Sequence, residues 1–406
     1  MEYFTSILPN GIRFIHMPTT RPVSHLGVII NAGSRDELED EKGLAHYIEH
    51  VIFKGTKKRK AYHILSRLED IGGELDAYTT KEDTVVYSSF LESYLERSIE
   101  LLSDILFSSI FPEKEILKEK EVILDEMNAY LDTPSEQIYD DFENLLFRDH
   151  SLGHNILGDK QSLKQFTKKH IQKFMDRTHN TDQMVICSIG KTPVDKVEKM
   201  IQKYFSKIKE NKRTWSRVPF STSPIFHHTE SIQTHQAHCM IGNRAYSSFD
   251  KNGKALILLN NLLGGPGLNS RLNLLLREKH AWVYNIESSY TRYSDTGVWS
   301  VYFGSDKNNY HKILKALKKE LLQMATINLG PRQLNKAKQQ IIGQMALSSE
   351  NNQEMLLGIG KNYLLYNTID SFEDIKEKVH QITVDDIRNV AQDIFNIDKL
   401  STLTFI

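Results

Sequence analysis

The chain has 406 residues, of which 40% are apolar and 25% are charged, a composition typical of folded globular domains and not of filaments or disordered tails. Its 51 Lys and Arg nearly balance its 52 Asp and Glu, which argues against nucleic acids and anionic membranes as partners. No stretch reaches the roughly 18 apolar residues that cross a bilayer. The chain has only two cysteines, far apart in the sequence, which fits reduced thiols in a reducing compartment. We therefore expect a cytoplasmic protein and, from its length, two domains.

The N-terminal half predicts strands and helices in mixed order. An Asn-Gly turn at residues 10–11 separates two extended runs and predicts a hairpin, followed by a strand over 23–34. Apolar residues from Leu44 to Ile52 recur at helical spacing. Further helices are predicted over 61–71, 91–107, 113–131 and 193–207, with a strand pair over 75–90 and a strand over 184–189.

The second half repeats the first in a divergent form. Residues 237–248 match the early strand by pattern, 253–265 match the helix that follows it, and 296–306 match 83–93. Residues 211–228 lose this periodicity and carry prolines, which predicts a linker. We therefore predict an α+β fold with two similar domains, 1–210 and 229–406, each a sheet covered by helices.

The stretch GLAHYIEHVIFKG at 43–55 contains His46, Glu49 and His50. On a helix these side chains fall within an arc of about 100°, away from the apolar face, so both imidazoles could bind one ion. That spacing suits zinc with a nearby carboxylate acting on a water molecule. The chain holds 16 histidines, so an ordinary helix with two of them is the alternative, and the matching helix of the second half has none.

A catalytic zinc site needs a third protein ligand. The helix predicted over 113–131 offers Glu119, Glu121, Asp125 and Glu126. Glu119 and Glu126 are seven residues apart and share one face, whereas Glu121 points elsewhere. Spacing leaves both open as the ligand, and a solvated surface carboxylate is the usual alternative for each.

Together with the blocks LPNGIRFI, GGELDAYTTKEDTVVY, ILDEM and SRLNLLLREKHAWVY, this motif closely resembles the pitrilysin and mitochondrial processing peptidase family of zinc metallopeptidases. The resemblance covers nearly the whole chain. It implies one zinc ion per chain, held by His46, His50 and Glu126. It also implies that Glu49 is the general base and that Glu119 orients a ligand histidine.

The resemblance also implies how a peptide is bound. Arg277 and Tyr284 would act on the substrate from the second half, and the strand that contains Asp76 and Ala77 would accept it as an added strand. Family members usually carry Asn in place of Asp76. We expect an endopeptidase for unstructured peptides whose chamber is closed by a homodimer; the alternative is a non-proteolytic structural or partner subunit of the same fold.

Overall fold

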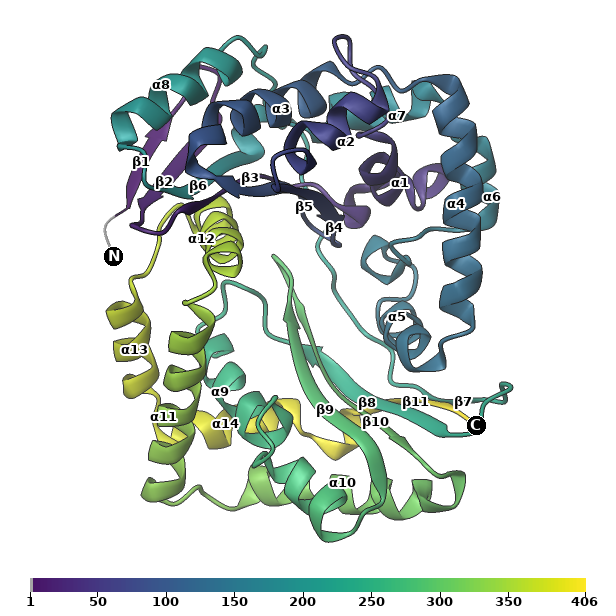
Figure 1. Ribbon diagram of the computed structural model, residues 1–406. Coiled ribbons are helices and arrows are strands. Elements are labelled where there is room, and N and C mark those ends of the chain that lie inside the picture. Colours follow the sequence, from purple (N-terminus) through teal and green to yellow (C-terminus); the bar gives the residue numbers. More distant parts are fainter. Residues whose placement is uncertain (1–2) are drawn as a thin grey trace. The chain divides into compact units, whose positions relative to one another are not determined.

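The computed structural model describes residues 3–406 and contains two compact units (Figure 1). The first consists of Met1–Met127, His154–Arg217 and Leu347–Ser371, and the second of Asn128–Gly153, Val218–Ala346 and Phe372–Ile406. The boundary between Arg217 and Val218 falls inside the predicted linker. The other boundaries were not anticipated, because each unit takes one segment from the opposite half of the chain.

The first unit is built on a mixed sheet of six strands. Its order is β1 (Phe4–Ile7), β2 (Arg13–Pro18), β6 (Met184–Gly190), β3 (Val23–Ile30), β5 (Thr84–Leu91) and β4 (Glu74–Thr79). β2 and β6 are parallel and the other pairs antiparallel. One face packs against α2 (Ala61–Glu69), α3 (Leu95–Ser108) and α8 (Val194–Phe205). β4 ends the sheet and leaves one edge open.

The second unit has a five-stranded sheet. Its order is β7 (His227–Glu230), β11 (Ser401–Phe405), β8 (Ala237–Ala245), β10 (Gly297–Ser305) and β9 (Val283–Arg292). One face carries the larger core, formed with α9 (Gly253–Gly264), α10 (Tyr310–Thr326), α11 (Pro331–Ser348) and α14 (Val384–Ile394). α13 (Phe372–Gln381) precedes α14. The predicted α+β class, with two helix-covered sheets, is confirmed.

The two sheets share their connectivity, as the internal repeat predicted. In each unit the early strand, β3 or β8, lies between an antiparallel hairpin strand, β5 or β10, and a late strand, β6 or β11. The late strand in turn has a parallel neighbour, β2 or β7. β4 and β9 therefore occupy equivalent edges.

One helix on the second face of each sheet comes from the other half of the sequence. α12 (Asn352–Tyr366) places Leu356 and Tyr363 against Ile29, Val185 and Cys187 of the first sheet. α5 (Pro134–Leu146) packs Ile138, Phe142 and Leu146 on the second sheet. Each sheet thus buries both faces only by recruiting a distant segment.

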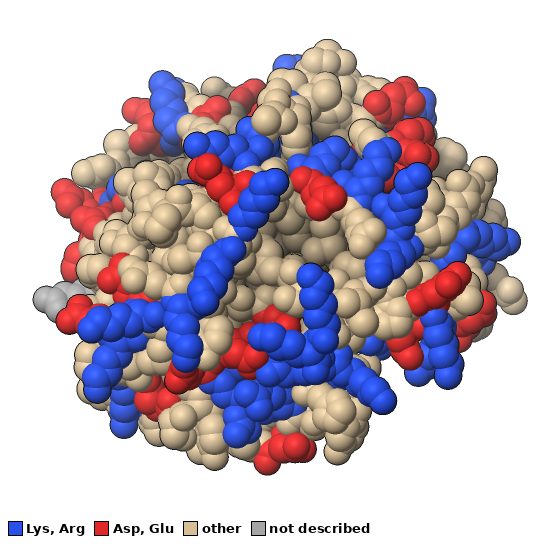
Figure 2. All heavy atoms as spheres, turned by 90° about the horizontal axis from the view of Figure 1, so that it is seen from above, with Lys and Arg blue, Asp and Glu red and all other residues tan. Residues whose placement is uncertain are grey.

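The surface charge, the two thiols and the hydropathy of the helices can each be compared with the sequence. Basic and acidic side chains both reach the face shown in Figure 2, as the balanced totals predict. Cys187 and Cys239 are buried free thiols on β6 and β8. Within residues 3–406, no helix combines the length and the apolar character that a membrane crossing requires.

Candidate metal centre

The short helix α1 (Leu44–Val51) carries the histidine motif. Its apolar residues Leu44, Ile48 and Val51 are buried in one cluster with α7 (Lys168–Thr178) and α4 (Glu113–Leu131). The opposite face presents His46 and His50, whose ring centroids are 4.7 Å apart. Because the apolar face is fixed in the core, both imidazoles are held on the same side of the helix.

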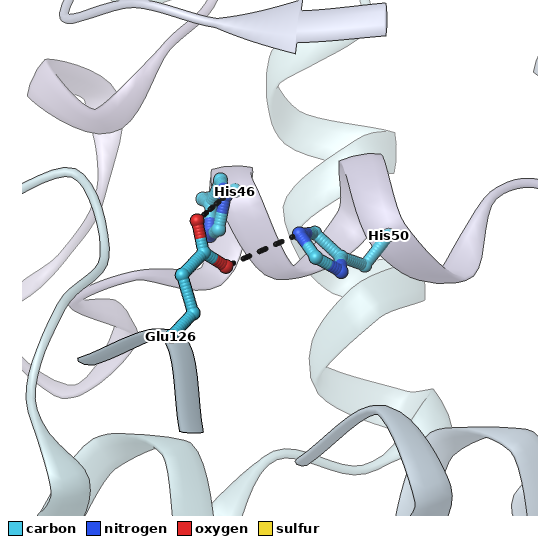
Figure 3. A group of neighbouring side chains, drawn as sticks. All are labelled: His46, His50 and Glu126. Carbon is cyan, nitrogen blue, oxygen red and sulfur yellow. Dashed lines mark ion pairs between the residues drawn. The ribbon is translucent and has the colours of Figure 1, made fainter. Parts of the chain in front are cut away.

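α4 brings a carboxylate to this pair (Figure 3). Glu126 Oε1 is 3.8 Å from His46 Nε2, and Glu126 Oε2 is 3.6 Å from His50 Nε2. One ligand atom from each of the three residues can be chosen so that all lie within 4.8 Å of one another. Two atoms bound to the same zinc ion at about 2.1 Å and a tetrahedral angle are about 3.4 Å apart. The spacing is too long for hydrogen bonds and fits an ion between the groups.

Glu119 approaches His50 at Nδ1, whereas Glu126 approaches it at Nε2. Its Oε2 is 3.4 Å from His50 Nδ1, and its Oε1 is 2.9 Å from the ammonium of Lys54. The Glu119 side chain is only 4% exposed. With Nδ1–H donating to this carboxylate, His50 keeps the lone pair of Nε2 for a metal ion.

Burial sets the protonation of His46. Burial, with a smaller contribution from the neighbouring His50, lowers the pKa of this imidazole to about 4. The neutral form is the one that binds metal ions. His46 Nδ1 is buried without a hydrogen-bond partner among residues 3–406.

Glu49 is partly buried beside the three candidate ligands. The pKa of its carboxyl group is raised to about 7, first by burial and then by the charges of Asp76 and Glu126, while the nearby Thr79 opposes the rise. Its Oε2 has no hydrogen-bond partner in the described part of the chain. A buried unpaired carboxylate oxygen is costly unless a ligand or water molecule pairs with it.

The open edge of β4 holds the two residues expected to accept a peptide. Ala77 is 8% exposed, whereas Asp76 is exposed. Asp76 Oδ1 accepts the Ala77 N–H (2.8 Å) and Asp76 Oδ2 accepts the Tyr87 hydroxyl (2.9 Å). The Asp76 carboxylate thus accepts a hydrogen bond from a backbone N–H of its own edge strand.

Arg277 and Tyr284 belong to the second unit. Arg277 is exposed in a π-helical turn (Asn273–Lys279), and Tyr284 is exposed near the start of β9. The Tyr284 hydroxyl donates to Asp306 Oδ1 at 3.0 Å. Both side chains are available to a ligand on that unit.

A cleft in the first unit lies apart from this centre. It has a volume of about 1060 Å³ and is lined by α3, α7 and the end of α8, including Asp104, His179 and Tyr204. Neither the three candidate ligands nor Glu49 line it. Four lysines and four carboxylates share its wall, so its charge selects no ligand class.

Sequence reasoning missed two groups that hold the motif helix. Lys54 pairs with Glu119, and Glu37 accepts the N–H groups of Gly43 and Ala45. Lys54 lies four residues after His50, a spacing that could have drawn attention to it. No spacing rule connects Glu37 to the helix, because the bond spans an irregular loop.

Comparison with known proteins defines the family. The family model for insulinase (peptidase family M16) matches residues 14–160, and the model for the peptidase M16 inactive domain matches residues 165–341. The chain belongs to peptidase family M16, which confirms the resemblance seen in the sequence.

The relatives are proteins of similar length. An uncharacterized zinc protease of Bacillus subtilis is 30% identical over 96% of this chain and 95% of its own length. One from Rickettsia felis is 31% identical over 96% of this chain and 94% of its own length. The crystal structure of a protease from Helicobacter pylori shares the fold, with a TM-score of 0.91, 23% identity, and coverage of 100% of this chain and 99% of that one.

Proposed function

We propose that the protein is a zinc-dependent endopeptidase for unstructured peptides, with one zinc ion per chain held by His46, His50 and Glu126. The observation that carries the proposal is the convergence of three ligand atoms within 4.8 Å next to the partly buried Glu49. The zinc-protease names of the full-length relatives support it.

A bound zinc ion would supply Lewis acidity, which polarises the scissile carbonyl and lowers the pKa of a water molecule. Glu49 takes a proton from the attacking water as the water oxygen bonds to the carbonyl carbon. It returns the proton to the amine nitrogen as the C–N bond breaks. Without a metal ion the pKa of Glu49 is about 7, raised mainly by burial, so this carboxyl group starts near neutral pH, where a base can both accept and return a proton.

The substrate would add to the open edge of β4 as an extended strand, beside Asp76 and Ala77. This mode of binding favours unfolded segments, because most backbone N–H and C=O groups of a folded chain are already hydrogen-bonded. Arg277 would donate to a peptide carbonyl, and the Tyr284 hydroxyl would stabilise the oxyanion.

Cleavage of a mixed library of unstructured peptides, read by mass spectrometry, tests this function. The zinc-loaded protein should produce new termini, and Glu49→Gln should bind zinc equally well but lose about 10²–10⁴-fold in rate. Cleavage by Glu49→Gln at the wild-type rate would exclude Glu49 as the base. If both proteins hold zinc and neither cuts, the alternative of a non-proteolytic subunit is favoured.

We further propose that two copies close a chamber and that Arg277 and Tyr284 act on substrate bound at the other copy. Mixing equal amounts of Glu49→Gln and Tyr284→Phe chains, each inactive alone, tests it. Random exchange makes half of the dimers mixed, and each mixed dimer has one site with both residues intact. Activity should recover to about a quarter of the wild-type value. Sites completed within one chain would give no recovery.

A further inference from the structure

The motif helix α1 begins without a cap of its own. It has eight residues, and its N-cap position is Gly43, in the left-handed conformation (φ 88°) and with no side chain to accept a hydrogen bond. The first N–H groups of a helix have no partners inside the helix, and so short a helix is not stable by itself. An outside acceptor is needed just before His46.

Glu37 supplies that acceptor from the preceding loop. Its Oε2 accepts the Gly43 N–H at 2.9 Å, and its Oε1 accepts the Ala45 N–H at 2.8 Å. Both oxygens of one carboxylate therefore hold the start of α1, and Glu37 is only 6% exposed. Burial raises the pKa of the Glu37 carboxyl group well above its usual range, and the two N–H groups of Ala45 and Gly43 oppose that rise.

The loop around Glu37 is itself fixed. Asp36 Oδ2 accepts the Gly33 N–H at 3.0 Å and pairs with Arg217 at 2.8 Å. On the other side, Glu41 Oε2 accepts the Leu38 N–H at 3.1 Å and pairs with Arg177. A carboxylate held on both sides can act as a rigid support.

The start of α1 also abuts a second loop. A Cβ atom on Gly43 would lie 2.5 Å from the Leu157 carbonyl oxygen and 2.8 Å from Gly158 Cα. The chain therefore cannot shift toward Gly158, and Glu37 prevents it from unwinding. His46 is the third residue of a helix whose first turn is confined in this way.

We propose that Glu37 is a positioning residue that presets the first turn of α1, and with it His46, for metal binding before the ion arrives. This inference rests on the proposed zinc site. The carboxylate acts through the backbone and touches neither the ion nor the substrate.

Zinc affinity, measured by competition with a chromophoric chelator, tests the role of Glu37. In Glu37→Gln the amide NH₂ faces one of the two N–H donors, so one bond is lost, and zinc should bind about 10 to 100-fold more weakly. Glu320→Gln is the control, because Glu320 is about as buried as Glu37 but lies on α10 of the second unit, where it pairs with Arg271. It should change zinc affinity less than about threefold. Equal zinc affinity in Glu37→Gln and Glu320→Gln would overturn the inference.

Hydrogen exchange of the wild-type protein gives a second readout that does not depend on folding of a variant. In the zinc-free chain, the Gly43 and Ala45 amides should already be protected, and added zinc should change their exchange little. Rapid exchange of these amides without zinc would overturn the presetting role. A wild-type chain that binds no zinc would instead contradict the proposed function.

Discussion

Glu49 differs from the surface carboxylates of α4 because the fold makes its charge costly. Burial is the largest cause of the rise in its pKa to about 7. The charges of Asp76 and Glu126 raise it by less, and Thr79 opposes the rise. A carboxyl group whose pKa is raised by folding favours the folded state at low pH. That contribution is lost as the pH rises through about 7.

This predicts a pH-dependent stability difference in the zinc-free protein. At pH 8 Glu49→Gln should be more stable than wild type by about 2 kcal/mol, because the neutral amide avoids burying a charge. The advantage should shrink as the pH falls from 7 toward 4.5, where the wild-type carboxyl group is protonated in the folded chain. Urea unfolding in the presence of a chelator at the two pH values measures it.

Glu121→Gln provides the baseline for that comparison, because Glu121 lies on the exposed side of α4. It should alter stability little at either pH. An equal gain from Glu49→Gln at pH 8 and pH 5 would show that the Glu49 charge is not the cause.

At the scale of elements, the centre depends on how α1 and α4 are tied together. Apolar packing brings the helices into one core cluster, but it does not set the rotation of the His50 ring. Glu119 of α4 does so through Nδ1, and Lys54, just beyond α1, neutralises the same carboxylate. Glu119 therefore links α4 to the helix that carries the histidines.

Lys54→Met should accordingly weaken zinc binding about 10-fold. Without its ammonium partner the buried Glu119 carboxylate becomes less favourable in its charged form and orients His50 poorly. Chelator competition measures the change, and Lys57→Met is the control because Lys57 is exposed three residues further along. Unchanged affinity in Lys54→Met would assign Lys54 a surface role only.

At the scale of the whole molecule, each unit is completed by a helix from the other half of the sequence. α12 lies so close to the first sheet that a Cβ atom on Gly360 would be 2.4 Å from Cys187 Sγ and 2.4 Å from Ile29 Cδ1. Lys361 on the same helix pairs with Asp83 at 2.8 Å. The fold of the unit that holds the candidate metal centre therefore requires residues more than 340 positions from its start.

Two glycines of α12 give a matched test of this packing. Gly360→Ala should destabilise the protein by about 1–3 kcal/mol, because the sheet cannot admit the added methyl group without moving. Gly358→Ala, where nothing lies within 4 Å of the new Cβ, should stabilise it by about 0.5–1 kcal/mol through helix propensity. Denaturant unfolding of the full chain measures both, and the same sign for the two variants would refute close packing of α12.

The sequence was enough to predict the α+β class and the internal repeat, because hydrophobic periodicity depends on near neighbours in the chain. It was also enough to predict the family, because the family's motifs are short blocks in a fixed order. It also placed His46, Glu49 and His50 on one side of a helix. Spacing alone left Glu119 and Glu126 equivalent, since seven residues put both on one face, and only the family resemblance implied different roles for them.

Tertiary structure separated those two carboxylates: Glu126 reaches both imidazoles, while Glu119 is buried against His50 and Lys54. It also decided the exchange of α5 and α12 and the support of α1 by Glu37. Each of these depends on contacts between segments far apart in the chain or joined by irregular loops. Such contacts depend on which surfaces pack together in the folded chain. The local spacing of residues in the sequence does not predict them.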